Sequence, residues 1–428
     1  MTVAKVMLWG TEIGTVALPE GSSVARFEYD SDFITSGIQV APLTMPLSRQ
    51  VYSFPALPEE TFHGLPGMLA DSLPDKFGTA VINRWLESQG RSGNSLNAIE
   101  RLCYTGSRGM GALEYLPATG PKQNASEQIE LEALTRLADE ILSERMGWHA
   151  HAGADALAQI IQVGTSAGGA RAKAIVAYNE SSGDIRSGQI DAGPGYGYWI
   201  VKFDGIGSNS DRELSDEPGY TRREYAYYLM AQHAGIEMSE CRLLPDGKHA
   251  HFITKRFDRD ADTGGKIHML SLGGMAHFDF RDPESYSYEG AVQVMRRLEF
   301  GQDAVEQLFR RMVFNIMARN QDDHVKNVSF LMDKDGKWRL SPAYDVTYAY
   351  NPQGKWTSLH QMSANGKRGE FTLSDIMQTA EHMSIRKAKA RAIVAEVASA
   401  IGKWFDFAET AGMAEQDASA IGKTHIGW

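Results

Sequence analysis

The stretch that decides the fold is Arg319-Asn-Gln-Asp-Asp-His-Val-Lys-Asn327, a polar run that follows a strongly periodic segment. In residues 304–318, apolar side chains recur at alternating steps of three and one. This spacing predicts a buried α-helix, with Arg310 and Arg311 turned outward. The polar run is therefore expected to be a loop that leaves the end of a core helix.

A β-hairpin is predicted directly after this loop. Residues 328–332 and 337–340 are expected to be strands, joined by the turn residues 333–336. The second strand leads into Pro342-Ala-Tyr-Asp345. The sequence thus predicts a helix, a polar loop, a hairpin and an aspartate at the hairpin's exit.

Protein kinases need this arrangement of polar residues. One aspartate orients or deprotonates the attacking hydroxyl, an asparagine five residues later holds Mg²⁺, and a later aspartate holds the metal that bridges the nucleotide phosphates. Asp322, Asn327 and Asp345 fit these three roles. Asp323 is the rival for the base, but only Asp322 satisfies the five-residue step. Taken singly, such residues are more often simple turn and cap residues, so the set as a whole carries the prediction.

A kinase also needs a lysine that reaches the phosphates. Lys202 is the single charge of an apolar strand, 198–203, and shares a face with Tyr198 and Ile200. Glu224 is a candidate partner, although a capping box from Thr221 to Glu224 explains it equally well. A Gly-rich turn over 164–173 could place backbone N–H groups against phosphates, but it lacks the Gly-Lys-Ser/Thr ending of a Walker loop.

Composition limits the class of protein. The 428 residues are 43% hydrophobic, enough for two or three domains with proper cores. The net charge of −11 disfavours direct binding to nucleic acid through the overall field of the chain. Two cysteines, Cys103 and Cys241, suit a reducing cytosol and are too few for a zinc site. Without an apolar run of about 18 residues or a secretory leader, a soluble cytoplasmic protein is expected.

The best linker candidate is 117–126, a stretch rich in Pro, Gly, Ser and Asn. It suggests two parts, 1–122 and 123–428. The first is expected to begin with strands at 5–9, 14–18 and 24–29, and to contain a helix over 79–87. The second is expected to open with a helix from Ser126 to about Leu142 and to become mostly helical.

With these residues in hand, the chain resembles the HipA family of bacterial toxin kinases. Gly64-Leu-Pro-Gly-Met-Leu-Ala-Asp-Ser-Leu-Pro-Asp-Lys-Phe-Gly78 is similar to the family's N-terminal signature. Ser166-Ala-Gly-Gly-Ala-Arg-Ala-Lys173 resembles its Gly-rich loop, and Ile253-Thr-Lys-Arg-Phe-Asp-Arg259 its hinge strand. The resemblance covers all but about the last forty residues.

The resemblance implies an α+β, kinase-like fold of the HipA type, with a mixed α/β N-terminal subdomain that faces the antitoxin and a mostly helical C-terminal lobe. It implies a serine/threonine protein kinase toxin that uses ATP and Mg²⁺ on a protein target such as an aminoacyl-tRNA synthetase, and thereby causes growth arrest and persistence. It also implies a helix-turn-helix antitoxin of the HipB type, contact with operator DNA through that antitoxin alone, and a dimeric arrangement through it.

By matched position, Asp322 is the implied catalytic base, and Asn327 and Asp345 are the implied metal ligands. Ser166 is the implied site of an autophosphorylation that switches the kinase off, with Thr165 as its neighbouring alternative. The implied nucleotide contacts are Gly168, Gly169, Ala170, Arg171, Lys173, Lys202, Lys255, Phe257, His324 and Tyr344. Gly168 and Arg171 differ from better-known members.

Two other functions are weighed against this one. A catalytically inactive corepressor would use the kinase fold only to hold an antitoxin on DNA, and the presence of Lys202, Asp322, Asn327 and Asp345 disfavours it. A small-molecule kinase would share the loop motif, but the signature over 64–78 argues against it. ATP turnover separates the first alternative from a kinase, and phosphate incorporation into protein against metabolites separates the second.

Overall fold

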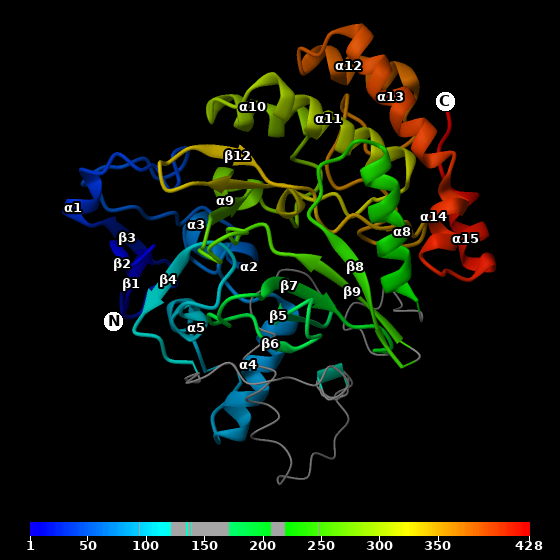
Figure 1. The fold of residues 1–428 in the computed structure, drawn as a ribbon. Coiled ribbons are helices and arrows are strands. Elements are labelled where there is room, and N and C mark those ends of the chain that lie inside the picture. Colours follow the sequence, from blue (N-terminus) through cyan, green and yellow to red (C-terminus); the bar gives the residue numbers. More distant parts are fainter. Residues whose placement is uncertain (94, 121–133, 136–137, 139–170, 207–218, 248) are drawn as a thin grey trace. The chain divides into compact units, whose positions relative to one another are not determined.

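The computed structural model describes residues 1–428 except 94, 121–133, 136–137, 139–170, 207–218 and 248 (Figure 1). The chain forms two compact units. Unit one comprises 1–218, 244–270 and 332–336, and unit two comprises 219–243, 271–331 and 337–428. Most of the helix expected at 126–142 and the Gly-rich turn at 164–170 lie outside the described residues. The boundary near residue 122 therefore stays a prediction.

Unit one begins with an antiparallel sheet in the strand order β3-β2-β1-β4. Its strands are β1 (Thr2–Leu8), β2 (Thr11–Leu18), β3 (Arg26–Tyr29) and β4 (Leu113–Leu116). The first two predicted strands are confirmed and form a hairpin, with the turn at Trp9 and Gly10, where both φ angles are positive. Such turns match the right-handed twist of the two strands. The helices of this part of the chain are α1 (Ser31–Ile34), α2 (Glu59–Phe62), α3 (Gly67–Ala70), α4 (Lys76–Ser88) and α5 (Ala98–Thr105), of which α1 and α5 contact this sheet.

Helix α4 packs on the second sheet of unit one. It begins at the N-cap Asp75, whose carboxylate accepts a hydrogen bond from Gly78 N at 2.6 Å. Its apolar face, including Val81 and Leu86, joins one buried cluster with Trp199 and Val201 of the sheet. Burial of that face, rather than helix propensity alone, stabilises such a helix. The predicted span 79–87 lies inside the observed one.

The second sheet of unit one has the strand order β6-β5-β7-β9-β8. Its strands are β5 (Lys173–Tyr178), β6 (Ile185–Ser187), β7 (Gly197–Lys202), β8 (Cys241–Asp246) and β9 (His249–Lys255). In β7, Trp199 and Val201 are fully buried, whereas Tyr198, Ile200 and Lys202 on the other face are half-buried. The predicted strand over 198–203 is therefore confirmed as β7, and Lys202 lies on its more open face.

Unit two is mostly helical, as expected. Its helices are α8 (Tyr220–His233), α9 (Leu272–Ala276), α10 (Tyr288–Arg297), α11 (Gln302–Met317), α12 (Leu373–His382), α13 (Lys387–Ile401), α14 (Trp404–Thr410) and α15 (Glu415–Gly422). Strand β10 (His268–Ser271) leads into it, and β11 (Ser329–Met332) and β12 (Trp338–Leu340) form the predicted hairpin. In the described part of the chain, no helix is long and apolar enough to cross a bilayer.

Helix α11 is buried on more sides than its periodicity predicts. The apolar stripe is confirmed, but the outward placement of Arg310 and Arg311 is wrong, because they are 9% and 5% exposed. Contacts with α10 and α13 enclose the helix (Figure 1). Arg310 donates to Ala234 O at 2.6 Å and pairs with Glu396 at 2.5 Å, and Arg311 donates to Ser341 O at 2.6 Å. Long side chains that find polar partners can thus occupy a buried face.

A second local expectation also fails. Helix α8 begins after the N-cap Gly219, which makes no side-chain capping bond. Thr221 and Glu224 are both buried inside the helix. The predicted capping box is therefore wrong.

Candidate active site

The polar loop starts from a fixed helix end. Helix α11 stops at Met317, and Arg319 has a φ of 59°. Met317 O accepts a hydrogen bond from Ile426 N, and Thr424 O accepts one from Arg319 Nε, each at 2.9 Å. The first contact satisfies a carbonyl that a helix end would otherwise leave open, and the second holds the residue that follows the helix. The C-terminal segment thus holds the entry to the loop.

The two neighbouring aspartates of the loop have different surroundings. The Asp322 side chain is 42% exposed, and its Oδ1 lies 3.8 Å from His324 Nε2. The Asp323 side chain is 1% exposed and bonded within the protein. A general base must reach the proton that it removes. Access therefore favours Asp322 over Asp323 for that role.

Asn327 is oriented by Asp322. Its Nδ2 donates to Asp322 O at 2.7 Å, across the short 3₁₀ turn η1 (Val325–Asn327). His324 is the N-cap of that turn, and its Nδ1 accepts from Lys326 N at 3.2 Å. Because the amide nitrogen is engaged, the amide oxygen of Asn327 is left as its possible metal ligand.

The loop after β12 is tied to the polar loop by Tyr344. The Tyr344 hydroxyl donates to Lys326 O at 2.5 Å and lies 2.5 Å from Ser329 Oγ. The next residue, Asp345, has a φ of 53°, in the left-handed region that non-glycine residues seldom adopt. Such backbone conformations persist where the surroundings impose them, often at functional sites.

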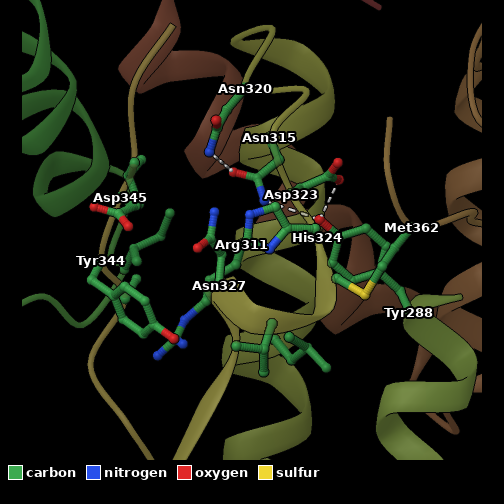
Figure 2. Close-up of a pocket in the computed structure, with 15 residues that line it drawn as sticks. Tyr288, Arg311, Asn315, Asn320, Asp323, His324, Asn327, Tyr344, Asp345 and Met362 are labelled. Carbon is green, nitrogen blue, oxygen red and sulfur yellow. Dashed lines mark hydrogen bonds between the residues drawn. The ribbon is translucent and has the colours of Figure 1, made fainter. Parts of the chain in front are cut away.

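These residues surround one cavity in unit two. Its lining includes Arg311, Asp323, His324, Asn327, Tyr344 and Asp345 (Figure 2). The described residues contain no group of three or more His, Cys, Asp or Glu that could hold a metal without help. Mg²⁺ uses few protein ligands and completes its shell with water and substrate phosphates. The carboxylate of Asp345 and the amide oxygen of Asn327 fit that requirement.

The predicted nucleotide contacts of the N-terminal side belong to unit one. Lys202 and Lys173 are directly opposite in the β5–β7 register, on the same face of the sheet. Lys173 is buried and pairs with Asp75, Nζ to Oδ2, at 3.2 Å. The Nζ of Lys202 lies 5.8 Å from the centre of the Phe252 ring.

Of the remaining predicted site residues, some are described by the structure and others are not. Lys255 lies in β9, with its Nζ 5.9 Å from the centre of the Trp199 ring, and Arg171 and Phe257 are half-buried. Ser166, with its alternative Thr165, and the predicted contacts Gly168, Gly169 and Ala170 lie outside the described residues.

Sequence reasoning missed three buried residues that support the site. Arg311 was assigned to the surface, and Tyr288 and His360, which contact Asp323, were not singled out. The only signal for Arg311 was its position in an otherwise apolar helix. Nothing local marks His360, because its contact spans 37 residues.

Two protein-family models match this chain. A model of the HipA N-terminal domain matches residues 4–116, and one of the HipA-like C-terminal domain matches residues 165–405. The chain belongs to the HipA family. Its α+β, kinase-like architecture agrees with the fold expected of that family.

A solved structure and curated relatives extend this comparison. A HipA chain of Shewanella oneidensis MR-1, solved with HipB and operator DNA, superposes with a TM-score of 0.67 at 15% identity, over 98% of this chain and 94% of that one. Putative kinases from Sinorhizobium fredii (Y4mE) and Haemophilus influenzae are 25% and 26% identical over 35% and 33% of this chain. The matched regions span 40% and 46% of those relatives.

Proposed function

We propose that the protein is a serine/threonine protein kinase that uses ATP and Mg²⁺. One observation carries the proposal. Asn327 is hydrogen-bonded to Asp322, and Asn327 lines the same cavity as Asp345. A base, a metal-binding amide and a metal-binding carboxylate are the parts that phosphoryl transfer needs, because catalysis rests on positioning and charge stabilisation.

Each part has a distinct task in this proposal. Asp322, which is accessible, orients the attacking hydroxyl and accepts its proton. Asn327 and Asp345 hold Mg²⁺, which neutralises charge on the phosphates. Lys202 binds those phosphates as a fixed positive charge. The other proposed nucleotide contacts are Gly168, Gly169, Ala170, Arg171, Lys173, Lys255, Phe257, His324 and Tyr344.

Calorimetric binding of a non-hydrolysable ATP analogue tests the metal site. For the wild type we expect Mg²⁺ to strengthen binding. In Asp345→Asn, which keeps the shape of the side chain, this gain should fall roughly tenfold or more, as expected when a charged ligand is lost. Asp335→Asn is the matched control, because Asp335 is an exposed residue of the β11–β12 turn. Equal Mg²⁺ dependence in Asp345→Asn and the wild type would contradict the metal assignment.

We further propose that the kinase is the toxin of a toxin–antitoxin pair. A HipB-type helix-turn-helix antitoxin would bind it, arrange it as a dimer and carry it to operator DNA. Its target would be a protein such as an aminoacyl-tRNA synthetase, and its phosphorylation would arrest growth. Phosphopeptide mass spectrometry of cells that express the wild type or Asp322→Ala would identify the target. If no phosphopeptide depends on Asp322, the proposal is contradicted.

Autophosphorylation at Ser166 is the proposed off-switch. A phosphate there adds about −1.5 to −2 charge at pH 7 and would repel the nucleotide's own phosphates. After incubation with ATP, we expect mass spectrometry to find phosphate on Ser166 and the modified protein to bind ATP more weakly. Equal ATP affinity of the two forms would rule out the switch.

A further inference from the structure

Asp323 is enclosed by donors from separate segments of unit two. Its Oδ2 accepts from the Tyr288 hydroxyl at 2.7 Å and from His360 Nδ1 at 2.9 Å, and its Oδ1 accepts from Gln361 N at 2.8 Å. Tyr288 begins α10, whereas His360 and Gln361 lie in the chain before α12. Figure 2 shows Tyr288 and Asp323 side by side at the cavity.

The contacts continue from Tyr288 to the start of the loop. Asn315 Nδ2 donates to the Tyr288 hydroxyl at 3.0 Å, and Asn320 Nδ2 donates to Asn315 Oδ1 at 2.9 Å (Figure 2). Gln321 N also donates to Ala349 O at 3.1 Å. The residues on both sides of Asp322 are therefore fixed, while the Asp322 side chain stays accessible.

The surroundings of Asp323 favour its carboxylate form. Burial by itself would raise the pKa of this carboxyl group, but His360 and the hydrogen bonds from Tyr288 and Gln361 outweigh burial and hold the pKa below its usual value. An ionised carboxylate is an acceptor only, and its hydrogen bonds are stronger than those between neutral groups. Three such bonds define the direction of the backbone at Asp323.

We propose that Asp323 is a positioning residue, which Tyr288 and His360 hold so that Asp322 meets the attacking hydroxyl and Asn327 meets the metal. The proposal rests on the kinase function inferred above. The Asp323 side chain lines the cavity but is only 1% exposed, and Tyr288, His360 and Gln361 occupy its carboxylate, so we assign it no contact with the substrate. Its effect is transmitted through the peptide bond to Asp322 and through the turn to Asn327.

Tyr288→Phe is the main test, because it removes one hydroxyl and keeps the ring. Tyr286→Phe is the matched control two residues away: its hydroxyl accepts from Asp279 N at 2.7 Å, and it has no hydrogen bond to Asp323. We expect Tyr288→Phe to lower kcat for phosphotransfer roughly 10- to 100-fold, because a displacement of the Asp322 carboxylate by about 1 Å would cost that much in rate. The KM for ATP should change less than kcat does, because Lys202 and Asp345 keep their own contacts with the nucleotide and the metal. Tyr286→Phe should match the wild type.

Hydrogen exchange gives a measure that does not depend on activity. Amides of residues 319–328 should exchange faster in Tyr288→Phe than in Tyr286→Phe, because the loop has lost an anchor. Asp323→Asn, which keeps the size of the side chain, should show the same faster exchange together with a lower kcat. Thermal midpoints of all variants show whether each is folded.

The two possible failures can be told apart. If the wild type transfers phosphate and Tyr288→Phe has an unchanged kcat, or if exchange over 319–328 does not change, the positioning role is wrong. If Tyr288→Phe lowers the thermal midpoint and changes kcat and KM to the same extent, Tyr288 has only a structural role and the proposal is also overturned. A wild type without phosphotransfer contradicts the kinase function, and exchange alone then decides whether Asp323 anchors the loop.

Discussion

Asp322 and Asp323 are neighbours in the chain, yet one side chain is open to solvent and the other is enclosed. The five-residue step to Asn327 favours Asp322 as the base, and its exposure supports the same choice. From the sequence, Asp323 could be considered only as a rival of its neighbour Asp322 for the role of base. Its partners, Tyr288 and His360, are 35 and 37 residues away, and a contact of that span leaves no local pattern.

Lys202 allows a prediction at the same scale. Lys202→Met should weaken ATP binding roughly 10- to 100-fold, the loss expected for a hydrogen bond between charged groups. The thermal midpoint should stay the same or rise, because a half-buried charge is removed. Titration with ATP and thermal unfolding measure the two effects.

The control for Lys202 is Lys5→Met. Lys5 is an exposed strand lysine of β1 that pairs with Glu12 at 2.6 Å, so its loss should not affect nucleotide binding. If Lys202→Met binds ATP as the wild type does, Lys202 is an ordinary half-buried strand residue.

At the scale of elements, Arg311 connects the helix before the polar loop to the loop that carries Asp345. Its guanidinium on α11 donates to Ser341 O, four residues before Asp345. Its Nε and Nη1 are buried without an acceptor among the described residues. Burial lowers the pKa of Arg311 to about 10. The charge of Arg311 is therefore poorly compensated. An arginine at this position is better explained by its role in holding the Asp345 loop than by a contribution to stability.

Arg311→Met tests this interpretation. We expect the thermal midpoint to stay the same or rise, because an apolar side chain of similar length can replace a buried charge at little cost. The phosphotransfer rate should fall about tenfold, because the Asp345 loop loses its tie to α11. Arg310→Met is the control, since Arg310 binds Ala234 and Glu396 instead. A fall in midpoint with an unchanged rate would show that Arg311 is purely structural.

Helices with a clear periodicity of apolar residues could be predicted from the sequence, but the elements that pack against them could not. The stripe of α11 predicted a helix over 304–318, and the observed helix spans Gln302–Met317. The same stripe implied a surface for Arg310 and Arg311, because a pattern of apolar residues does not show what packs on the remaining face. The capping box from Thr221 to Glu224 was likewise wrong, since α8 begins at Tyr220, after its N-cap Gly219.

At the scale of the whole molecule, charge limits the route to DNA. A chain with a net charge of −11 lacks the positive field that supplies most non-specific affinity for DNA. We expect the isolated protein not to bind its operator at physiological salt, and binding to appear with a basic antitoxin. Fluorescence anisotropy of labelled operator DNA measures this. Tight, sequence-selective binding by the isolated chain would contradict it.

The proposed metal-side residues are the ones that spacing in the sequence alone could suggest. Asp322, Asn327 and Asp345 could be proposed because a fixed spacing connects them through one loop and one hairpin. The nucleotide-side residues come from segments that are far apart in the sequence, such as Lys202 in β7 and Lys255 in β9. Spacing carries no information on such pairs: Lys202 could be proposed only from its place in an apolar strand, and the family resemblance supplied Lys255.

The most direct test of the central claim is the initial rate of phosphate transfer from γ-labelled ATP to protein, measured for the wild type and for Asp322→Ala. We predict Mg²⁺-dependent transfer by the wild type. Transfer by Asp322→Ala should be at least about 100-fold slower, the usual contribution of a general base. The variant should keep the thermal midpoint and ATP affinity of the wild type, because the Asp322 side chain is exposed. Transfer by Asp322→Ala at the wild-type rate, or none by the folded wild type, would contradict the account.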